Sequence, residues 1–490
     1  MSVRRSLAWL MISQGGFFVL QFGGAIVLAR LLTPYDMGIY AAAAAIIGIL
    51  GILQAFGLTL LIIREPEVDP DLLASAFTIN ALLAVLLALT IIGLSAFGGA
   101  FLREPGVERV MLALAPLPLI GIFEFLPATL LERRAEFRVI AVINLLRAAV
   151  TTSVAVSLAF AGFSYMSIAW GSIASAVVGA VAFMIAGRQH VSFRVGLAAW
   201  RHVLKFGLQQ LAIQGVNAVS GRAAEFLLGR LLGLSALGLY GRASNLNNMI
   251  WSNIHLVVGR VVLVDLAEQR RRGIDLRDGY LRIVELITAL LWPCFAGLAV
   301  LAGPLINIVY GSAWVAAAPP LAALAVAAIL LISITMTWEL FVICHETNRQ
   351  ARFEFMRTGV GLVMFIAGCL VSLTGAAVGR IGEALFSIFI YRPHIERMTS
   401  TRLADYIPIY RRSAILTTAA CGPALVLMIA YGWSPHVPFA LVAAVIAAGV
   451  AAWLGAVFLT DHALLDELRR IVAKGRQMAG LTPDATAGHP

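Results

Sequence analysis

The chain is divided into apolar runs of about 20 residues, separated by short segments that carry most of the charge. A helix of about 20 apolar residues crosses the hydrocarbon core of a bilayer, which is roughly 30 Å thick. Within lipid, helices and closed barrels are the structures that satisfy their own backbone hydrogen bonds. Because 60% of the residues are hydrophobic and 13% are charged, with a mean hydropathy of +0.91, the predicted fold class is an all-α, multi-pass membrane protein.

We interpret the runs as 14 transmembrane helices. They lie at about 7–29, 38–62, 73–97, 110–131, 139–161, 165–187, 205–228, 239–263, 281–303, 319–343, 355–374, 376–393, 411–432 and 437–460. The first run follows Arg4-Arg5 and resembles a signal peptide, but it is too long and lacks a good cleavage site. The eleventh and twelfth runs are the least distinct, because only Thr374-Gly375 separates them and Arg380 and Glu383 interrupt the second.

The loop charges predict the orientation of the chain. If the N-terminus lies in the cytoplasm, 27 of the 36 Lys and Arg residues fall in inner segments, five at outer ends and four in or near spans. Such an excess of positive charge marks the cytoplasmic side, so we expect both termini to lie in the cytoplasm. The net charge of +10 then faces anionic membrane lipids and does not indicate nucleic acid.

An internal repeat organises the chain. The stretch Ala29–Tyr40 recurs 200 residues later as Gly229–Tyr240, and 10 identities fall between positions 14 and 43 without a gap. The matching positions are Gln14, Gly15, Val19, Leu28, Arg30, Leu31, Leu32, Gly38, Tyr40 and Ala43. Repeats in membrane proteins commonly place the substrate path where the two halves meet, so we expect two related halves around such a path.

A second similarity sets the size of each half. Arg133-Arg-Ala-Glu-Phe137 resembles Arg349-Gln-Ala-Arg-Phe353, and each segment follows the fourth helix of its half. We therefore predict two pseudo-symmetric six-helix lobes, related by an axis along the membrane normal, followed by two extra helices and a tail. The predicted boundaries are 1–187 for the first lobe, 188–204 for a linker, 205–398 for the second lobe, 399–462 for the extra helices and 463–490 for a cytoplasmic tail. The linker has an apolar and a charged side, which fits an interfacial helix or an ordinary basic loop equally well.

Polar side chains at membrane depth are the default candidates for function, because burying them in lipid is costly. In the seventh span they follow one helical face at Gln210, Gln214, Asn217, Gly221 and Glu225, and Arg222 lies three residues before Glu225, close enough to pair with it. The eighth span repeats the pattern with Asn245, Asn248, Ser252 and His255, and Gln14 and Gln21 mark the first span. Two adjacent polar stripes favour a water-filled cavity, although such residues often only join helices, at about 0.6 kcal/mol each.

Several charged residues add to this candidate site. Arg147, in the fifth span, and Arg222 are candidate anion contacts, although Arg147 could also snorkel to the headgroups and Arg222 could serve only as the partner of Glu225. Glu225, Glu124 and Glu339 are candidate sites for coupling to Na⁺ or H⁺. His255 fits a hydrogen-bonded packing residue better than a proton carrier.

Motifs for soluble chemistry are missing from the sequence. No P-loop, HExxH or GxSxG motif occurs, and Cys294, Cys344, Cys369 and Cys421 form no CxxC pair. We therefore expect no metal site, no cofactor other than a coupling ion, and no enzymatic activity. The short outer loops also argue against a membrane-embedded glycosyltransferase or polysaccharide ligase.

Two segments resemble a known family. The stretch Ala29–Tyr40 is similar to the signature of bacterial polysaccharide transporters, the Wzx-type oligosaccharide flippases, and Ile308-Val-Tyr-Gly-Ser-Ala-Trp314 with the following apolar residues resembles that family's segment before span ten. The resemblance covers most of residues 1–400. It implies the fold of the multidrug/oligosaccharidyl-lipid/polysaccharide exporter superfamily, with two lobes around a central cavity.

The resemblance also implies a function. The expected substrate is an oligosaccharide on an undecaprenyl pyrophosphate carrier, flipped from the inner to the outer leaflet by alternating access during the synthesis of exopolysaccharide, O-antigen (lipopolysaccharide) or capsule. The expected partners are this lipid-linked oligosaccharide, membrane lipids and the polysaccharide polymerase machinery, with no nucleic acid. A multidrug or lipid II exporter of the same fold is the nearest alternative, and a glycosyltransferase or ligase is the second.

Overall fold

The computed structural model describes residues 3–51, 56–67, 69–188, 193–460 and 462–465; within these, the side chains of 3–14, 17–18, 212–220, 252–265 and 267 are excepted. These residues form helices, and none of the described residues lies in a strand. The chain separates into two compact units. Unit 1 contains Met1–Gly241 and Val309–Trp314, and unit 2 contains Arg242–Ile308 and Val315–Pro490.

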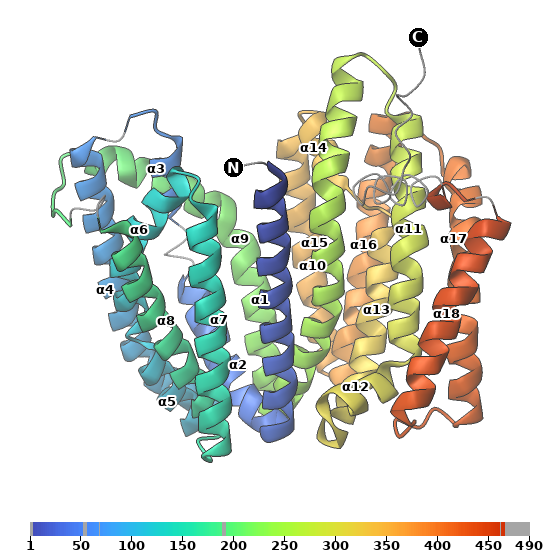
Figure 1. The fold of residues 1–490 in the computed structure, drawn as a ribbon, viewed down its shortest axis with the longest axis horizontal. Coiled ribbons are helices and arrows are strands. Elements are labelled where there is room, and N and C mark those ends of the chain that lie inside the picture. Colours follow the sequence, from blue (N-terminus) through green and yellow to red (C-terminus); the bar gives the residue numbers. More distant parts are fainter. Residues whose placement is uncertain (1–2, 52–55, 68, 189–192, 461, 466–490) are drawn as a thin grey trace, which may run out of the picture. The chain divides into compact units, whose positions relative to one another are not determined.

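Unit 1 is a bundle of long helices, drawn in blue to green in Figure 1. In it, α7 packs against α1, α6 and α8, while α9 packs against α2, α3 and α4. Its helices are α1 (Val3–Leu31), α2 (Pro34–Leu50), α3 (Leu58–Arg64), α4 (Pro70–Leu102), α5 (Pro105–Leu114), α6 (Leu117–Arg133), α7 (Phe137–Phe160), α8 (Met166–Gly187), α9 (Trp200–Leu232) and the first residues of α10 (Leu234–Arg271).

Unit 2 is built around two helix pairs. Here α15 packs against α16 and α17 against α18, and α11 and α13 connect the pairs, because α13 contacts α16 and α11 contacts α17. Besides the rest of α10, its elements are α11 (Arg277–Val300), α12 (Ala302–Tyr310), a 3₁₀ helix (Ser312–Ala317), α13 (Ala318–Ile332), α14 (Thr337–Ile343), α15 (Thr347–Cys369), α16 (Leu373–Thr399), α17 (Leu403–Ala430) and α18 (Phe439–Leu459); unit 1 takes the last residues of α12 and the start of the 3₁₀ helix.

The all-α membrane fold is confirmed. Each predicted run falls on one helix or on two consecutive helices. Among the described residues, nine helical stretches are long and apolar enough to cross a membrane, and Val19–Leu31 and Pro34–Leu50 are shorter apolar helices. The weakest expected span is a continuous helix, α16, in spite of Arg380 and Glu383. The number of 14 spans and the lobe boundaries remain predictions.

The linker before α9 is a loop where it is described. Residues 193–197 have no regular structure, because α4 takes up backbone groups that a helix would use. The Thr78 Oγ1 accepts from the Gly196 amide at 3.0 Å, and the Ser75 Oγ accepts from the Ala199 amide at 2.9 Å. Residues 193–199 are therefore not helical, and the place of the linker at the membrane interface stays a prediction.

The fourth helix of each predicted half is broken at a similar place. One break separates α5 from α6 at Ala115-Pro116, and the other separates α13 from α14 at Ser333–Met336. When the two halves of the sequence are aligned so that Arg133 matches Arg349, these two breaks fall at neighbouring positions of the alignment. In unit 2 the freed carbonyls are satisfied by tyrosines: the Tyr280 hydroxyl donates to Thr335 O at 2.9 Å and the Tyr410 hydroxyl to Ser333 O at 2.8 Å.

The first copy of the repeated motif is a helix end followed by a helix start. Thr33 is the N-cap of α2, with its amide donating to Asp36 Oδ2 at 3.0 Å and its Oγ1 accepting from the Asp36 amide at 3.2 Å. Pro34 occupies the first helical position, where its missing N–H costs nothing. The sequence Thr-Pro-Tyr-Asp therefore starts a new helix, α2, directly after the end of α1.

The two copies of the motif pack against each other within unit 1. A Cβ on Gly38 would lie 1.9 Å from Leu234 O, and a Cβ on Gly238 would lie 2.0 Å from Pro34 O. Positions 34 and 38 correspond to 234 and 238 in the repeat, so the contact is reciprocal, as in a two-fold interface. Both glycines are required because backbone meets backbone there.

The second segment that resembles the polysaccharide transporters, Ile308–Trp314, contacts the first copy of the repeated motif. The indole Nε1 of the buried Trp314 donates to Ala29 O at 2.6 Å. This bond explains why Val309–Trp314 belongs to unit 1 although its chain neighbours belong to unit 2. The two segments that resemble polysaccharide transporters are thus in direct contact.

Candidate functional site

An ion pair joins two residues that the sequence suggested separately. Arg147 Nη1 of α7 lies 2.5 Å from Glu124 Oε1 of α6, and the two side chains are 30% and 22% exposed. On the same face of α7, Asn144 is exposed and Thr151 donates its hydroxyl to Arg147 O at 2.9 Å. The anion candidate and the ion-coupling candidate are therefore partners in one ion pair in unit 1.

A glycine makes room for this arginine. A Cβ on Gly179 of α8 would lie 2.7 Å from Arg147 Cδ and 2.8 Å from its Nε. Distances below 3.0 Å are not compatible with a real Cβ contact unless something moves. The Arg147 side chain thus crosses α8 at Gly179, where a larger residue would displace it from its present path.

The predicted pair in α9 is confirmed. Arg222 Nη1 lies 3.1 Å from Glu225 Oε2, and the side chains are 50% and 38% exposed. Arg222 also passes over α2, since a Cβ on Gly48 would lie 3.0 Å from its Nε. Exposed charges on an intramembrane helix are expected to face water or protein and not lipid tails.

The remaining predicted residues are distributed over both units. In unit 1, Gln21 is exposed, and Gln210 packs so closely on α2–α3 that a Cβ on Gly57 would lie 2.5 Å from its Cγ. In unit 2, Asn245 and Asn248 are exposed and Glu339 is buried at 6% exposure. The side chains of Gln14, Gln214, Asn217, Ser252 and His255 lie outside the described residues.

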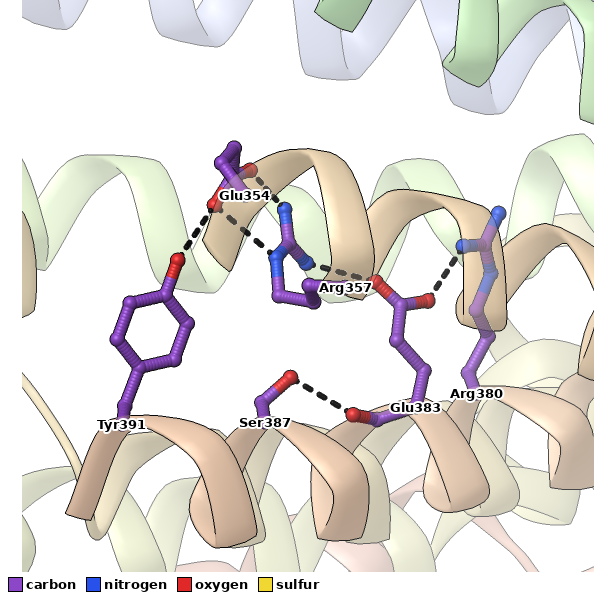
Figure 2. A network of polar contacts seen from close by, with 6 residues as sticks. All are labelled: Glu354, Arg357, Arg380, Glu383, Ser387 and Tyr391. Atoms are coloured by element: carbon purple, nitrogen blue, oxygen red, sulfur yellow. Dashed lines mark hydrogen bonds and ion pairs between the residues drawn. The ribbon is translucent and has the colours of Figure 1, made fainter. Parts of the chain in front are cut away.

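A larger charged network joins α15 to α16 in unit 2 (Figure 2). Arg357 donates to both oxygens of Glu354 and, through Nη1 at 2.7 Å, to Glu383 Oε1. Arg380 Nη1 donates to Glu383 Oε2 at 2.7 Å, and the Tyr391 hydroxyl donates to Glu354 Oε2 at 3.1 Å. All four carboxylate oxygens are therefore occupied, and the two acids balance the two bases.

This network has the properties of a clamp between two helices. The Glu383 side chain is 9% exposed, and a Cβ on Gly361 of α15 would lie 2.5 Å from its Cδ. Sequence reasoning placed Arg357 and Arg380 among loop or span-end charges and so missed the network. The available signal was the Glu354/Arg357 pair followed by the Arg380/Glu383 pair, both at the three-residue spacing that brings helical side chains together.

The second repeated segment supports different contacts in its two copies. Arg133 caps the end of α3, with Nη1 donating to Glu65 O at 2.7 Å and Nη2 to Pro66 O at 3.0 Å. Its counterpart Arg349 instead pairs with Glu346, which Arg397 also contacts. Burial raises the pKa of Glu346, but the hydrogen bonds from Arg397 and Arg349 outweigh this and bring the pKa below its usual value.

Similar proteins were found in sequence and in structure. The succinoglycan biosynthesis transport protein ExoT of Rhizobium meliloti (strain 1021) is 27% identical over 331 residues, covering 66% of each chain, just under two thirds. A membrane protein of the cps region of Klebsiella pneumoniae is 21% identical over 413 residues, covering 82% of this chain and 84% of that one.

The fold is also similar to a solved structure. The lipid II flippase MurJ, in an inward closed conformation, aligns with a TM-score of 0.73 at 12% identity and covers 92% of this chain and 98% of its own. At this identity the likeness concerns the fold. Residues 27–319, more than half of the 490 residues, match the family model described as Polysaccharide biosynthesis protein. The chain is thus a multi-pass membrane protein that belongs to this polysaccharide biosynthesis family.

Proposed function

We propose that this protein is a flippase that moves an undecaprenyl-pyrophosphate-linked oligosaccharide from the inner to the outer leaflet for surface polysaccharide synthesis. The observation that carries the proposal is the fold of a lipid II flippase in a chain that matches the polysaccharide biosynthesis family. The name of ExoT, a succinoglycan biosynthesis transport protein, supports the same class of activity. Transport then proceeds by alternating access, with an ion gradient as the energy source.

The charged residues of unit 1 suit the pyrophosphate end of such a substrate. Arg147 and Arg222 carry planar guanidinium groups, which bind two phosphate oxygens at once, and both have exposed area. Gln21, Gln210 and Asn144 have amide groups that suit sugar hydroxyls or water. In this role the protein binds and moves its substrate and breaks no bond in it, so it is not an enzyme.

The cellular setting follows from the same proposal. The protein lies in the bacterial inner membrane with both termini in the cytoplasm, since most positive loop charges are then inside. Its partners are the lipid-linked oligosaccharide, the surrounding lipids and the polymerase that extends the flipped units. A multidrug or lipid II exporter of the same fold is the nearest alternative, with which the MurJ-like fold is consistent.

Deletion of the gene in its host tests the function directly. We expect loss of the surface polymer, with complete but unpolymerised lipid-linked units accumulating on the inner leaflet. Units that accumulate on the outer leaflet would instead indicate a polymerase or ligase. Unchanged polymer and unchanged units would favour export of drugs or of another lipid.

Complementation of the deletion strain tests the role of Arg222. The Arg222→Ala variant should lower export while its abundance in the membrane stays at the wild-type level. Full export by this variant would remove Arg222 from the mechanism.

A further inference from the structure

We propose that Glu124 and Arg147 form an exchange site, in which a phosphate group takes Arg147 from Glu124 and Glu124 takes up a proton. The inference rests on the proposed function and adds to it: it assigns a proton to the binding of a phosphate-bearing ligand. It starts from the contact between the two side chains, which lie 23 positions apart in the sequence and on different helices.

The Arg147–Glu124 contact is held by fewer bonds than the clamp in unit 2, whose arginines are exposed to a similar degree, 27% and 28%. One hydrogen bond is described between the two side chains, which are 30% and 22% exposed. In the clamp, Glu383 is 9% exposed and each of its carboxylate oxygens accepts from a different arginine. A ligand can therefore reach Arg147 without dismantling a network, whereas a ligand for the clamp would have to break several bonds.

Charge balance explains why a proton is involved. The closed pair is neutral. A phosphate oxygen that binds the guanidinium replaces the carboxylate as the partner of Arg147, because guanidinium and phosphate form strong, paired hydrogen bonds. The released carboxylate would then be an unpaired charge in a helix whose neighbouring residues are apolar, and uptake of a proton removes the cost of that charge. A proton from water binds Glu124, and the site stays neutral with arginine, one phosphate charge and a carboxylic acid.

Among the residues whose side chains the structure describes, the helices that pack against α6 and α7 carry no other charged group near the middle of these two helices. Against α6 and α7 pack α1, α3, α4 and α8. Of these, α8 has no ionisable side chain, α3 has only Arg64 at its last residue, and α4 has only Asp71 in its first turn. Helix α1 has Arg30 near its end and Arg4 and Arg5 at its start, the latter two outside the described side chains. In α6 and α7 themselves, Glu132, Arg133 and Arg138 lie near helix ends. Arg147 is thus the charged group that faces Glu124.

The exchange also provides a route for release. When Glu124 loses its proton, its carboxylate competes again for Arg147 and displaces the phosphate. Phosphate and proton therefore bind and leave together, which keeps the buried charge constant through the transport cycle. The site balances the charge of an anionic substrate and does not by itself draw energy from a proton gradient.

Proton uptake on binding can be measured with the purified full-length protein. Farnesyl pyrophosphate is a suitable probe, because it is a soluble pyrophosphate on an isoprenoid chain. Isothermal titration calorimetry in buffers with different ionisation heats yields the number of protons bound per ligand. Wild type is compared with Glu124→Gln, and Glu383→Gln is the matched control, since it removes a carboxylate from the clamp in unit 2. The protonation of the probe itself cancels in the difference between variants.

We expect wild type to take up about one proton more per ligand than Glu124→Gln around neutral pH. For each unit by which the pH rises, the affinity of wild type for farnesyl pyrophosphate should fall by up to about tenfold more than the affinity of Glu124→Gln. Glu383→Gln should take up protons as wild type does, and Arg147→Ala should lose binding. If Glu124→Gln does not fold, Glu124→Asp is tested instead. A displaced midpoint in the pH dependence of its ligand affinity supports the exchange, and an unchanged midpoint contradicts it.

Two results would overturn the inference, and they differ in what they say about transport. Equal proton uptake by wild type and Glu124→Gln contradicts the exchange while the proposed flippase function stands. Failure of wild type to bind any pyrophosphate contradicts the proposed function and the exchange together. Binding by Arg147→Ala at wild-type affinity also contradicts the exchange, because the phosphate would then have another partner.

Discussion

At the scale of single residues, the structure assigns partners to charges that the sequence could only locate. Arg147 and Glu124 were both conspicuous because each interrupts an apolar run. Their pairing depends on how α6 and α7 pack, which no local pattern encodes. Arg222 and Glu225 were predicted to pair because they are neighbours on one helix, and they do so at 3.1 Å.

Gly179 should be as important for transport as the arginine that crosses it. The change Gly179→Val forces the Arg147 stem away from α8, since even a Cβ would lie 2.7 Å from Arg147 Cδ. Overpacking of this kind costs about 1–3 kcal/mol, and we expect export to fall several-fold in the deletion strain. Gly121→Val is the control, because a Cβ there has no atom within 4 Å. Equal export by the two variants would contradict a role for this crossing.

His462, which follows α18, should make folding stability depend on pH. It is fully buried, 3.5 Å from Glu285 Oε1, and burial, with a smaller effect of Arg412, lowers its pKa although Glu285 opposes this. The unfolded imidazole titrates near pH 6.5. Below that pH the unfolded chain binds the proton more readily than the folded one, so stability falls on acidification until the folded group also titrates.

Thermal unfolding of the purified protein checks this effect. The Tm should fall between about pH 7.5 and 5.5 in wild type, and the fall should be smaller in His462→Gln. The exposed His436 supplies the control, and His436→Gln should behave as wild type. An identical fall in Tm for all three proteins would show that His462 does not carry the pH dependence.

At the scale of elements, the packing of the two motif copies on each other explains why the motif contains glycine. Both copies need a glycine because Gly38 and Gly238 each lie on the backbone of the opposite copy, at Leu234 and Pro34. Trp314 then joins the segment Ile308–Trp314 to the end of α1 through its hydrogen bond to Ala29 O. The sequence left the linker open between a helix and a loop, since the hydroxyls of Ser75 and Thr78 that bind residues 196 and 199 belong to a distant helix.

Substitution of either motif glycine should impair the protein to a similar degree. In Gly38→Ala and Gly238→Ala, a methyl group would lie about 2 Å from a carbonyl oxygen of the other copy. We expect each to lower the amount of folded protein and export several-fold, with a cost of about 1–3 kcal/mol or more. Fluorescence-detected size-exclusion chromatography measures the folded fraction. Gly241→Ala, with no atom within 4 Å of its Cβ, should match wild type, and a strong effect of only one of the two substitutions would argue against a reciprocal contact.

At the scale of the whole molecule, the membrane topology is the prediction that most of the functional argument depends on. With 14 spans and an inner N-terminus, the loop after α7 lies outside and the loop after α10 lies inside. Single cysteines at Phe163→Cys and Arg272→Cys, in a variant without the four native cysteines, report on these loops. A membrane-impermeant maleimide should label the first in intact cells and the second only after permeabilisation. Labelling of both without permeabilisation would contradict the orientation.

The sequence by itself determined the features that depend on local physics and on similarity along the chain. Apolar runs of bilayer length predict the helices, and the repeat predicts two related halves. The tertiary structure decided which helices meet. It joined Arg147 to Glu124, closed the clamp around Glu383 and set the two motif copies on each other. The physical reason is that helices in lipid are stable individually, whereas their contacts depend on small residues and polar pairs whose partners lie far away in the sequence.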